Sequence, residues 1–173
     1  MHKQRGITLV EACVTLAVTT IVATGAAPSM QQLLDARRFD GAASQVASDL
    51  QFTRTAAVAR NQRVRFSLQT DATGSCYVIH TGGADACRCG DSGPAVCDSG
   101  ASEIRTVRLP ASDRVTVQTN VASILFDPVH GTSTPAGTVR VLGSGRELRH
   151  IVNVMGRVRS CSAQGSVAGF RAC

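Results

Sequence analysis

The N-terminal stretch MHKQRGITLVEACVTLAVTTIVATGAAPSM, residues 1–30, decides how the rest of the chain is organised. Its first six residues are mostly polar, carry two basic side chains and end at Gly6. Residues 7–27 are apolar or small, apart from hydroxyl side chains and Glu11. These residues would form a helix of about 31 Å, which is enough to cross the hydrocarbon core of a bilayer. The basic leader favours a cytoplasmic N-terminus, so the remainder of the chain is expected on the other side.

Glu11 is the one carboxylate in this apolar run, one turn from its start. A carboxylate at the centre of a membrane helix costs roughly 2.5–3.5 kcal/mol, and less near an end. The sequence therefore predicts a partner for Glu11. An ordinary signal peptide is the alternative, and it would need a small-x-small cleavage site after its apolar core. Ala23 and Gly25 could imitate such a site, but a carboxylate inside that core would be unusual.

The order K-x-R-G, then I-T-L-V-E, then an apolar helix resembles the class III signal of type IV pilins and type II secretion pseudopilins. This resemblance implies that a prepilin peptidase cleaves after Gly6 and methylates the new N-terminus at Ile7, where the family usually has Phe. It also implies that Glu11 serves assembly by pairing with the free amine of a neighbouring pilin. Pro28 stands where many pilins carry a helix-kinking proline.

The same resemblance implies a location and partners. The protein would be a single-pass protein of the bacterial inner membrane, with a cytoplasmic N-terminus and a periplasmic C-terminal domain. It would later join other pilins in a pilus outside the cell. The expected segments are a leader at 1–6, a transmembrane helix at 7–28, an amphipathic helix at 29–62 and an antiparallel β domain at 63–173.

Two periodicities support this division. An apolar stripe at spacings of three and four predicts that the helix continues through residues 29–62 and packs on a core; it consists of Leu33, Leu34, Phe39, Ala43, Val46, Leu50, Thr53 and Ala57. Charged residues fall mostly off the stripe, among them Asp35, Arg37, Arg38, Asp40, Asp49 and Arg54. After residue 63 the period changes to two, which is typical of strands. The fold class is therefore α+β, and the resemblance implies the pilin fold.

Short strands are expected along the β domain, separated by turn-forming residues. A Gly-, Ala- and Ser-rich loop at 81–102 interrupts them. The expected strands are 64–68, 76–80, 104–109, 115–118, 123–126, 138–142 and 147–155, with a hairpin turn at 143–145.

The chain has seven cysteines. Cys13 lies in the apolar helix, and an even number in an exported domain predicts disulfides among the other six, Cys76, Cys87, Cys89, Cys97, Cys161 and Cys173. A Cys161–Cys173 bond would close a C-terminal loop at 161–173, as in many pilins. The other four would staple the loop at 81–102, in a pairing that the sequence leaves open. A zinc site is the alternative for these thiols, but no C-x-x-C pair is present and we expect no metal.

Basic charge is concentrated in the C-terminal part. The chain has 18 basic and 12 acidic residues, and removal of residues 1–6 leaves 16 basic residues and a net charge of +4. Residues 99–173 carry nine Arg against four acids, whereas residues 71–98 carry four Asp and one Arg. Aromatic residues are only 3% of the chain, which argues against a base-stacking surface for single strands.

The element Gly156-Arg157-Val158-Arg159 is the strongest candidate site. If it is extended, Arg157 and Arg159 share a face about 6.7 Å apart, while Val158 faces the core with Val152 and Val154. Paired guanidiniums suit phosphate oxygens. Gly156 would let the backbone turn and a duplex approach closely. Further arginines lie near in sequence, namely Arg146, Arg149 and Arg171.

The segments ILFDPVHGTS, TVRVL and LRHIVNVMGRVR resemble the C-terminal half of the family that joins the minor pseudopilin H of type II secretion with the FimT minor pilins. In the FimT branch a C-terminal G-R-x-R element is associated with DNA binding during natural transformation, and residues 156–159 match it. The resemblance implies a minor type IV pilin for DNA uptake, making sequence-independent, salt-sensitive phosphate contacts with double-stranded DNA.

Other functions remain open at this point. The chain could be a structural pseudopilin at the tip of a type II secretion pseudopilus, or a pilus-priming subunit without a ligand. The arginines could also be solvated or paired with Asp113, Asp127 or Glu147. No catalytic motif such as G-x-S-x-G or H-E-x-x-H is present, and His80 and His130 are better explained by packing or exposure. We therefore expect no enzyme and no cofactor.

Overall fold

The computed structural model describes residues 8–90, 93–165 and 167–173, without the side chains of residues 25–28. The leader, the predicted cleavage site after Gly6 and the predicted methylation site at Ile7 lie outside the described residues. The chain divides into two compact units, residues 1–34 and residues 35–173. Helix α1 (Leu9–Arg60) contributes to both.

In the first unit, α1 begins with the pattern Thr8-x-x-Glu11, which is typical of a helix N-terminus. The backbone N–H of Glu11 donates to the Thr8 hydroxyl oxygen at 3.3 Å. By length and composition this part of α1 could cross a membrane. Its large apolar side chains from Leu9 to Val22 are 55–81% exposed, so they have no protein core around them within the unit.

In the second unit, α1 contributes one face to the core. Most of the predicted stripe is confirmed, because Phe39, Ala43, Val46, Leu50, Thr53 and Ala57 are buried. The prediction was wrong for Leu33 and Leu34, which belong to the first unit and are about half exposed. The first helix residue in the core cluster is Phe39. The helix ends at Arg60, as Asn61 adopts a left-handed conformation and the N–H of Gln62 donates to the carbonyl of Ala57 at 3.2 Å.

Asp49 corrects the prediction that the charged residues of α1 lie off the stripe. It is fully buried, and its carboxylate accepts hydrogen bonds from the Tyr77 hydroxyl at 2.7 Å and the Gln45 amide at 2.9 Å. It also forms an ion pair with Arg105. Burial, and then the hydrogen bond to Asp49, raise the pKa of Tyr77, so the phenol remains a donor. A carboxylate with three such partners is tolerated inside the core.

The described strands of the second unit form three sheets, and all of their pairs are antiparallel. One sheet has the order β5-β2-β1-β7-β8, a second β11-β10-β9-β6, and a third β3-β4. The bounds are β1 (Val64–Asp71), β2 (Gly74–Thr81), β3 (Cys87–Arg88), β4 (Val96–Cys97), β5 (Glu103–Pro110), β6 (Val115–Thr119), β7 (Ser123–Phe126), β8 (Ser133–Thr134), β9 (Gly137–Gly143), β10 (Arg146–Val152) and β11 (Val158–Ser162).

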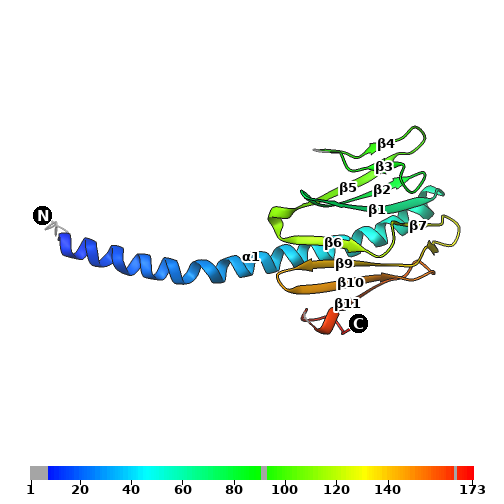
Figure 1. Ribbon diagram of the computed structural model, residues 1–173. Coiled ribbons are helices and arrows are strands. Elements are labelled where there is room, and N and C mark those ends of the chain that lie inside the picture. Colours follow the sequence, from blue (N-terminus) through cyan, green and yellow to red (C-terminus); the bar gives the residue numbers. More distant parts are fainter. Residues whose placement is uncertain (1–7, 91–92, 166) are drawn as a thin grey trace, which may run out of the picture. The chain divides into compact units, whose positions relative to one another are not determined.

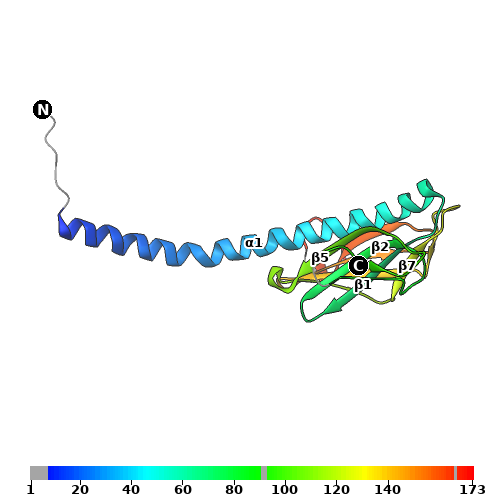
Figure 2. The same ribbon diagram turned by 90° about the horizontal axis from the view of Figure 1, so that it is seen from above.

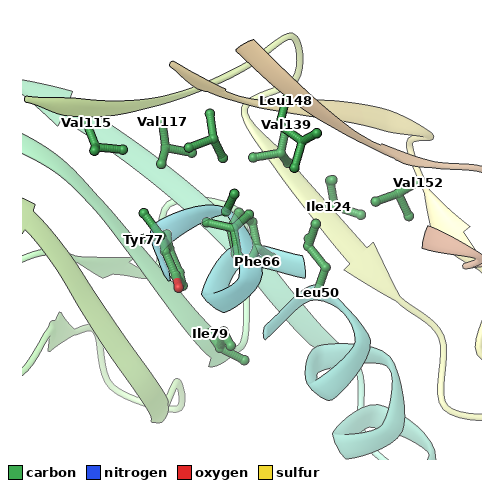
Figure 3. Close-up of a cluster of buried hydrophobic side chains, with 14 of the residues drawn as sticks. Leu50, Phe66, Tyr77, Ile79, Val115, Val117, Ile124, Val139, Leu148 and Val152 are labelled. Atoms are coloured by element: carbon green, nitrogen blue, oxygen red, sulfur yellow. The ribbon is translucent and has the colours of Figure 1, made fainter. Parts of the chain in front are cut away.

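The core of the second unit lies between α1 and the two larger sheets. Figure 1 shows residues 35–60 of α1 running past both sheets, and Figure 2 shows the helix along one side of the strands. Figure 3 shows Leu50 of α1 near Phe66 and Ile124 of one sheet, and Val139 and Leu148 of the other sheet belong to the same cluster of buried side chains. The α+β prediction, a long helix packed on antiparallel sheet, is therefore confirmed.

The predicted hairpin around residues 143–145 is present, but it is shorter than expected. Strands β9 and β10 are joined through Ser144 and Gly145, both with positive φ, as a tight hairpin turn requires. The predicted strand at 147–155 ends at Val152, because the chain then turns. Val154 is consequently 62% exposed and does not face the core, which corrects that prediction.

All six cysteines of the second unit form disulfides, as predicted. The bonds are Cys76–Cys89, Cys87–Cys97 and Cys161–Cys173, and Cys13 is a free, exposed thiol. The first two staple the loop at 81–102 to β2 and to itself, and the loop contains the short sheet β3-β4. Because their sulfurs are bonded to one another, these cysteines provide no thiolates for zinc.

Loss of stability in mild acid is expected from His150. This residue is 1% exposed, and burial lowers its pKa to about 4, against the ordinary value of 6.5. Between these values the unfolded chain binds a proton that the folded chain does not, so stability falls as pH falls. From pH 7 to pH 5 the loss is about 2 kcal/mol. Unfolding measured at both pH values for wild type and His150→Gln should show a shallower decline in the variant; an equal decline would contradict this assignment.

Candidate functional site

A tight turn at residues 153–157 leads from β10 into β11. The side-chain oxygen of Asn153 accepts the N–H of Arg157 at 2.9 Å, and its backbone carbonyl accepts the N–H of Gly156 at 2.8 Å. That carbonyl also accepts the Ser133 hydroxyl at 2.7 Å. The turn is therefore fixed both by its own backbone and by the neighbouring β8.

Gly156 is a buried residue of this turn and has a φ of +69°. A Cβ at this position would lie 2.0 Å from the carbonyl oxygen of Gly131 and 3.1 Å from Nε of Arg54. Arg54, on α1, donates through Nε to the same Gly131 carbonyl at 3.0 Å. Gly156 therefore lets the backbone turn, as predicted, and allows the close approach of two chain segments inside the protein.

Arg157 and Arg159 are exposed, on either side of the partly buried Val158, which packs against the core. Together with Arg171 they line a groove of about 620 Å³. Among the described residues, none of the ion pairs found involves these three arginines. The predicted alternation of the element is therefore observed, and its guanidiniums face a hollow in the surface.

The disulfide between Cys161 and Cys173 brings Arg171 to this groove. The backbone N–H of Ser162 donates to the Arg171 carbonyl at 2.8 Å, and the N–H of Cys173 donates to the Ser162 carbonyl at 3.0 Å. These bonds, with the disulfide, fix the last residues of the chain beside β11. Three arginines separated by up to 14 positions in sequence thus line one groove.

The remaining two candidate arginines lie outside the groove. Arg146 turns toward α1, where it binds the Ala36 carbonyl at 3.1 Å, pairs with Asp40 at 3.4 Å and covers the ring of Phe39. Arg149 pairs with Glu147 at 2.7 Å and is 39% exposed. Arg146 therefore has a role in packing the sheet on the helix, and Arg149 stays on the surface.

Two further residues near the site were not predicted from the sequence. Arg54 on α1 donates a hydrogen bond to the carbonyl of Gly131, which lies 77 positions further along the chain. No local sequence pattern predicts a contact of this kind. Arg140 on β9 lies directly opposite Arg149 of β10. The alternation of β9 could have indicated that Arg140 points away from the core, but the register that pairs it with Arg149 could not be read from the sequence.

The histidines that the structure describes give no indication of a catalytic site. His80 is fully buried and shares a 2.9 Å hydrogen bond with Ser67. Burial lowers the pKa of His80, and the neighbouring Thr81 carbonyl opposes this effect. His130 lies exposed in the turn after β7. Within the described part of the chain, no cluster of His, Cys, Asp or Glu side chains could hold a metal ion.

The class of protein follows from the fold and the N-terminal motif together. A long helix with an apolar N-terminal part, packed on antiparallel sheets, is the pilin fold. Two crystal structures of the type IV minor pilin FimU of Pseudomonas aeruginosa PAO1 are similar to it. One has a TM-score of 0.54 and 16% identity, covering 76% of this chain and 97% of FimU. The other has a TM-score of 0.51 and 18% identity, covering 72% and 97%.

Comparison of the sequence with protein families identifies a particular family within this class. A sequence profile described as "Type II transport protein GspH" matches residues 42–156, and one described as "Prokaryotic N-terminal methylation motif" matches residues 1–27. The chain belongs to the GspH family of pilin-like proteins, which are structural and not enzymatic. Such proteins assemble with other pilins or pseudopilins and are processed by the prepilin peptidase. The motif and the apolar helix are consistent with an inner-membrane pilin that is assembled into a pilus. A search of curated proteins found no match.

Proposed function

We propose that this protein is a minor type IV pilin of the FimT type that binds extracellular double-stranded DNA for uptake in natural transformation. The observation that carries the proposal is the groove lined by Arg157, Arg159 and Arg171, whose exposed guanidiniums have no carboxylate partner among the described residues. Such groups can each take two phosphate oxygens. Contacts of this kind position a duplex without reading its sequence.

The processing steps expected from the N-terminus belong to the same proposal. Cleavage after Gly6 would release Ile7 as the methylated N-terminus. Glu11 would then pair with the amine of a neighbouring pilin. Its place in the first turn of α1 supports this role, since a carboxylate there is stabilised by the helix dipole and lies near the end of the apolar segment.

A structural role in type II secretion is the second candidate. It is favoured by the profile match, whose description names a type II transport protein and which ends at Gly156, before the arginines of the groove. In that role the domain would help to build a pseudopilus tip, and the groove would have no nucleic-acid ligand. A pilus-priming subunit without a ligand predicts the same absence of binding.

DNA titration separates these functions. The full chain in non-ionic detergent is titrated with a duplex at two salt concentrations, alongside the variant Arg157→Gln/Arg159→Gln. We expect binding that weakens steeply with salt, and a loss of about 30-fold or more in the double variant, because two phosphate contacts are removed. Arg60→Gln/Arg63→Gln, which removes two exposed charges near the helix end, is the matched control and should lose little. No binding at low salt, or equal losses in both variants, would refute the proposal.

A further inference from the structure

Arginines cross the outer face of the sheet β11-β10-β9-β6. Arg140 on β9 pairs with Arg149 on β10, and Arg149 pairs with Cys161 on β11. Paired residues of antiparallel strands project from the same face. Because side chains alternate along a strand, Arg159 shares this face with Cys161. The opposite face carries the buried Val139, Val141, Leu148 and Val152, which belong to the core.

Two grooves flank Arg149 on this surface. The first is the groove of Arg157, Arg159 and Arg171 described above, which Ile151 of β10 also lines. The second has a volume of about 540 Å³ and is lined by Arg140 and by residues of β1 and of the chain from β6 to β7. Within it, Nη2 of Arg140 donates to the side-chain oxygen of Gln118 at 3.0 Å, which holds the guanidinium at the surface.

We propose that Arg140 and Arg149 form a second row of phosphate contacts, so that a bound duplex lies across strands β11, β10 and β9. This inference rests on the proposed function and extends it from one groove to the outer face of the sheet. Strands lie about 4.8 Å apart and rise about 3.3 Å per residue, which places Arg140 about 12 Å from Arg159. One DNA strand carries a phosphate for each ~3.4 Å of rise, so the surface from Arg140 to Arg159 spans three to four phosphates.

In the free protein, the carboxylate of Glu147 competes with any phosphate for Arg149 on this surface. Glu147 lies two residues before Arg149 on the same face, and its carboxylate is 2.7 Å from Nε of Arg149. A phosphate that approaches Arg149 must compete with this carboxylate and is also repelled by it. Replacement of Glu147 by glutamine should therefore strengthen DNA binding, whereas a surface without a ligand gives no reason for such a gain.

Four single variants of the full chain in non-ionic detergent test the inference, with a 30-base-pair duplex titrated over a salt series. Arg140→Gln should weaken binding about five-fold and reduce the magnitude of the salt slope by about 1, as expected for one lost phosphate contact. Arg140→Lys should recover most of the affinity. Glu147→Gln should strengthen binding at least two-fold. Arg88→Gln removes the same charge from an exposed position of β3 and should have no effect.

The outcomes distinguish the inference from the function on which it rests. The second row would be overturned if Arg140→Gln and Glu147→Gln left DNA binding unchanged while Arg157→Gln/Arg159→Gln abolished it. The groove alone would then be the site. An equal loss in Arg140→Gln and Arg88→Gln would also overturn it, because net charge alone would explain the effect. Absence of binding by the wild type would overturn both proposals.

Discussion

Replacement of Gly156 by alanine is expected to destabilise the second unit by about 3 kcal/mol. The added methyl group would lie 2.0 Å from the carbonyl oxygen of Gly131, and that atom is backbone held by Arg54. The φ of +69° is itself unfavourable for any residue with a Cβ. Since neither segment can yield without breaking the hydrogen bonds of the turn, we expect a clear loss in the free energy of unfolding, measured by urea titration with circular dichroism.

Gly145 provides the matched control for this substitution. It has a φ of +72°, but nothing lies within 4 Å of a Cβ built there. Gly145→Ala therefore reports the conformational cost alone, about 1 kcal/mol. The difference between the variants measures the steric cost of separating residues 131 and 156. Equal losses would show that these two segments are not packed together as described.

Replacement of Asp49 by alanine is expected to destabilise the protein by a similar amount, about 3 kcal/mol. The substitution leaves the buried hydroxyl of Tyr77 without its acceptor and removes the partner of Arg105. An unsatisfied buried donor costs roughly 1–3 kcal/mol, and breaking a buried ion pair costs more. Arg105 is 42% exposed and can be hydrated, which reduces the second contribution.

Asp40 is the control for the loss of a carboxylate from α1. It is 52% exposed and pairs with Arg146 at 3.4 Å, so Asp40→Ala should cost less than about 1 kcal/mol. The double variant Asp49→Leu/Arg105→Leu is a further comparison, because it removes both members of the ion pair but still leaves the Tyr77 hydroxyl without its acceptor. Its remaining cost therefore reports the lost acceptor rather than the unpaired Arg105. If Asp49→Ala were no worse than Asp40→Ala, the buried position of Asp49 would be contradicted.

The general fold could be predicted because its signals are local and repeated. Twenty or so apolar residues, a stripe of period 3.6 and then alternation of period two identify a long helix followed by strands without any knowledge of contacts. The bounds were less accurate where a contact decides them. Strand β10 ends at Val152, not at residue 155, because Asn153 closes a turn onto Gly156 and Arg157. Strand propensity at Val154 and Met155 gives no sign of this.

Asp49 shows a different limit of prediction from sequence. A charged residue on an amphipathic helix is expected in solvent, and the reasons for its burial lie 28 and 56 positions further along the chain, in Tyr77 and Arg105. The exposed positions of Leu33 and Leu34 have a related cause. Helical periodicity continues through them, but it does not show where the core begins.

The candidate site could be predicted in part, because one of its signals is also local in sequence. The alternation of Arg157, Val158 and Arg159 follows from an extended backbone, and the structure has Val158 partly buried between two exposed arginines. Proximity in sequence correctly indicated Arg171 but not Arg146, which contacts α1, and it gave no sign of Arg140. Sheet register decides which of them share a face, and the register is set by long-range pairing.

The disulfide between Cys161 and Cys173 makes completion of the arginine groove a late event in the life of the chain. Disulfides form in oxidising compartments, whereas cysteine thiols are kept reduced in the bacterial cytosol. On the export route that the methylation motif indicates, a newly made chain would carry Arg171 on an unfastened tail until its domain had left the cytoplasm. For the proposed role in DNA binding, this means that the chromosome would meet only the incomplete groove, whereas DNA outside the cell would meet the complete one.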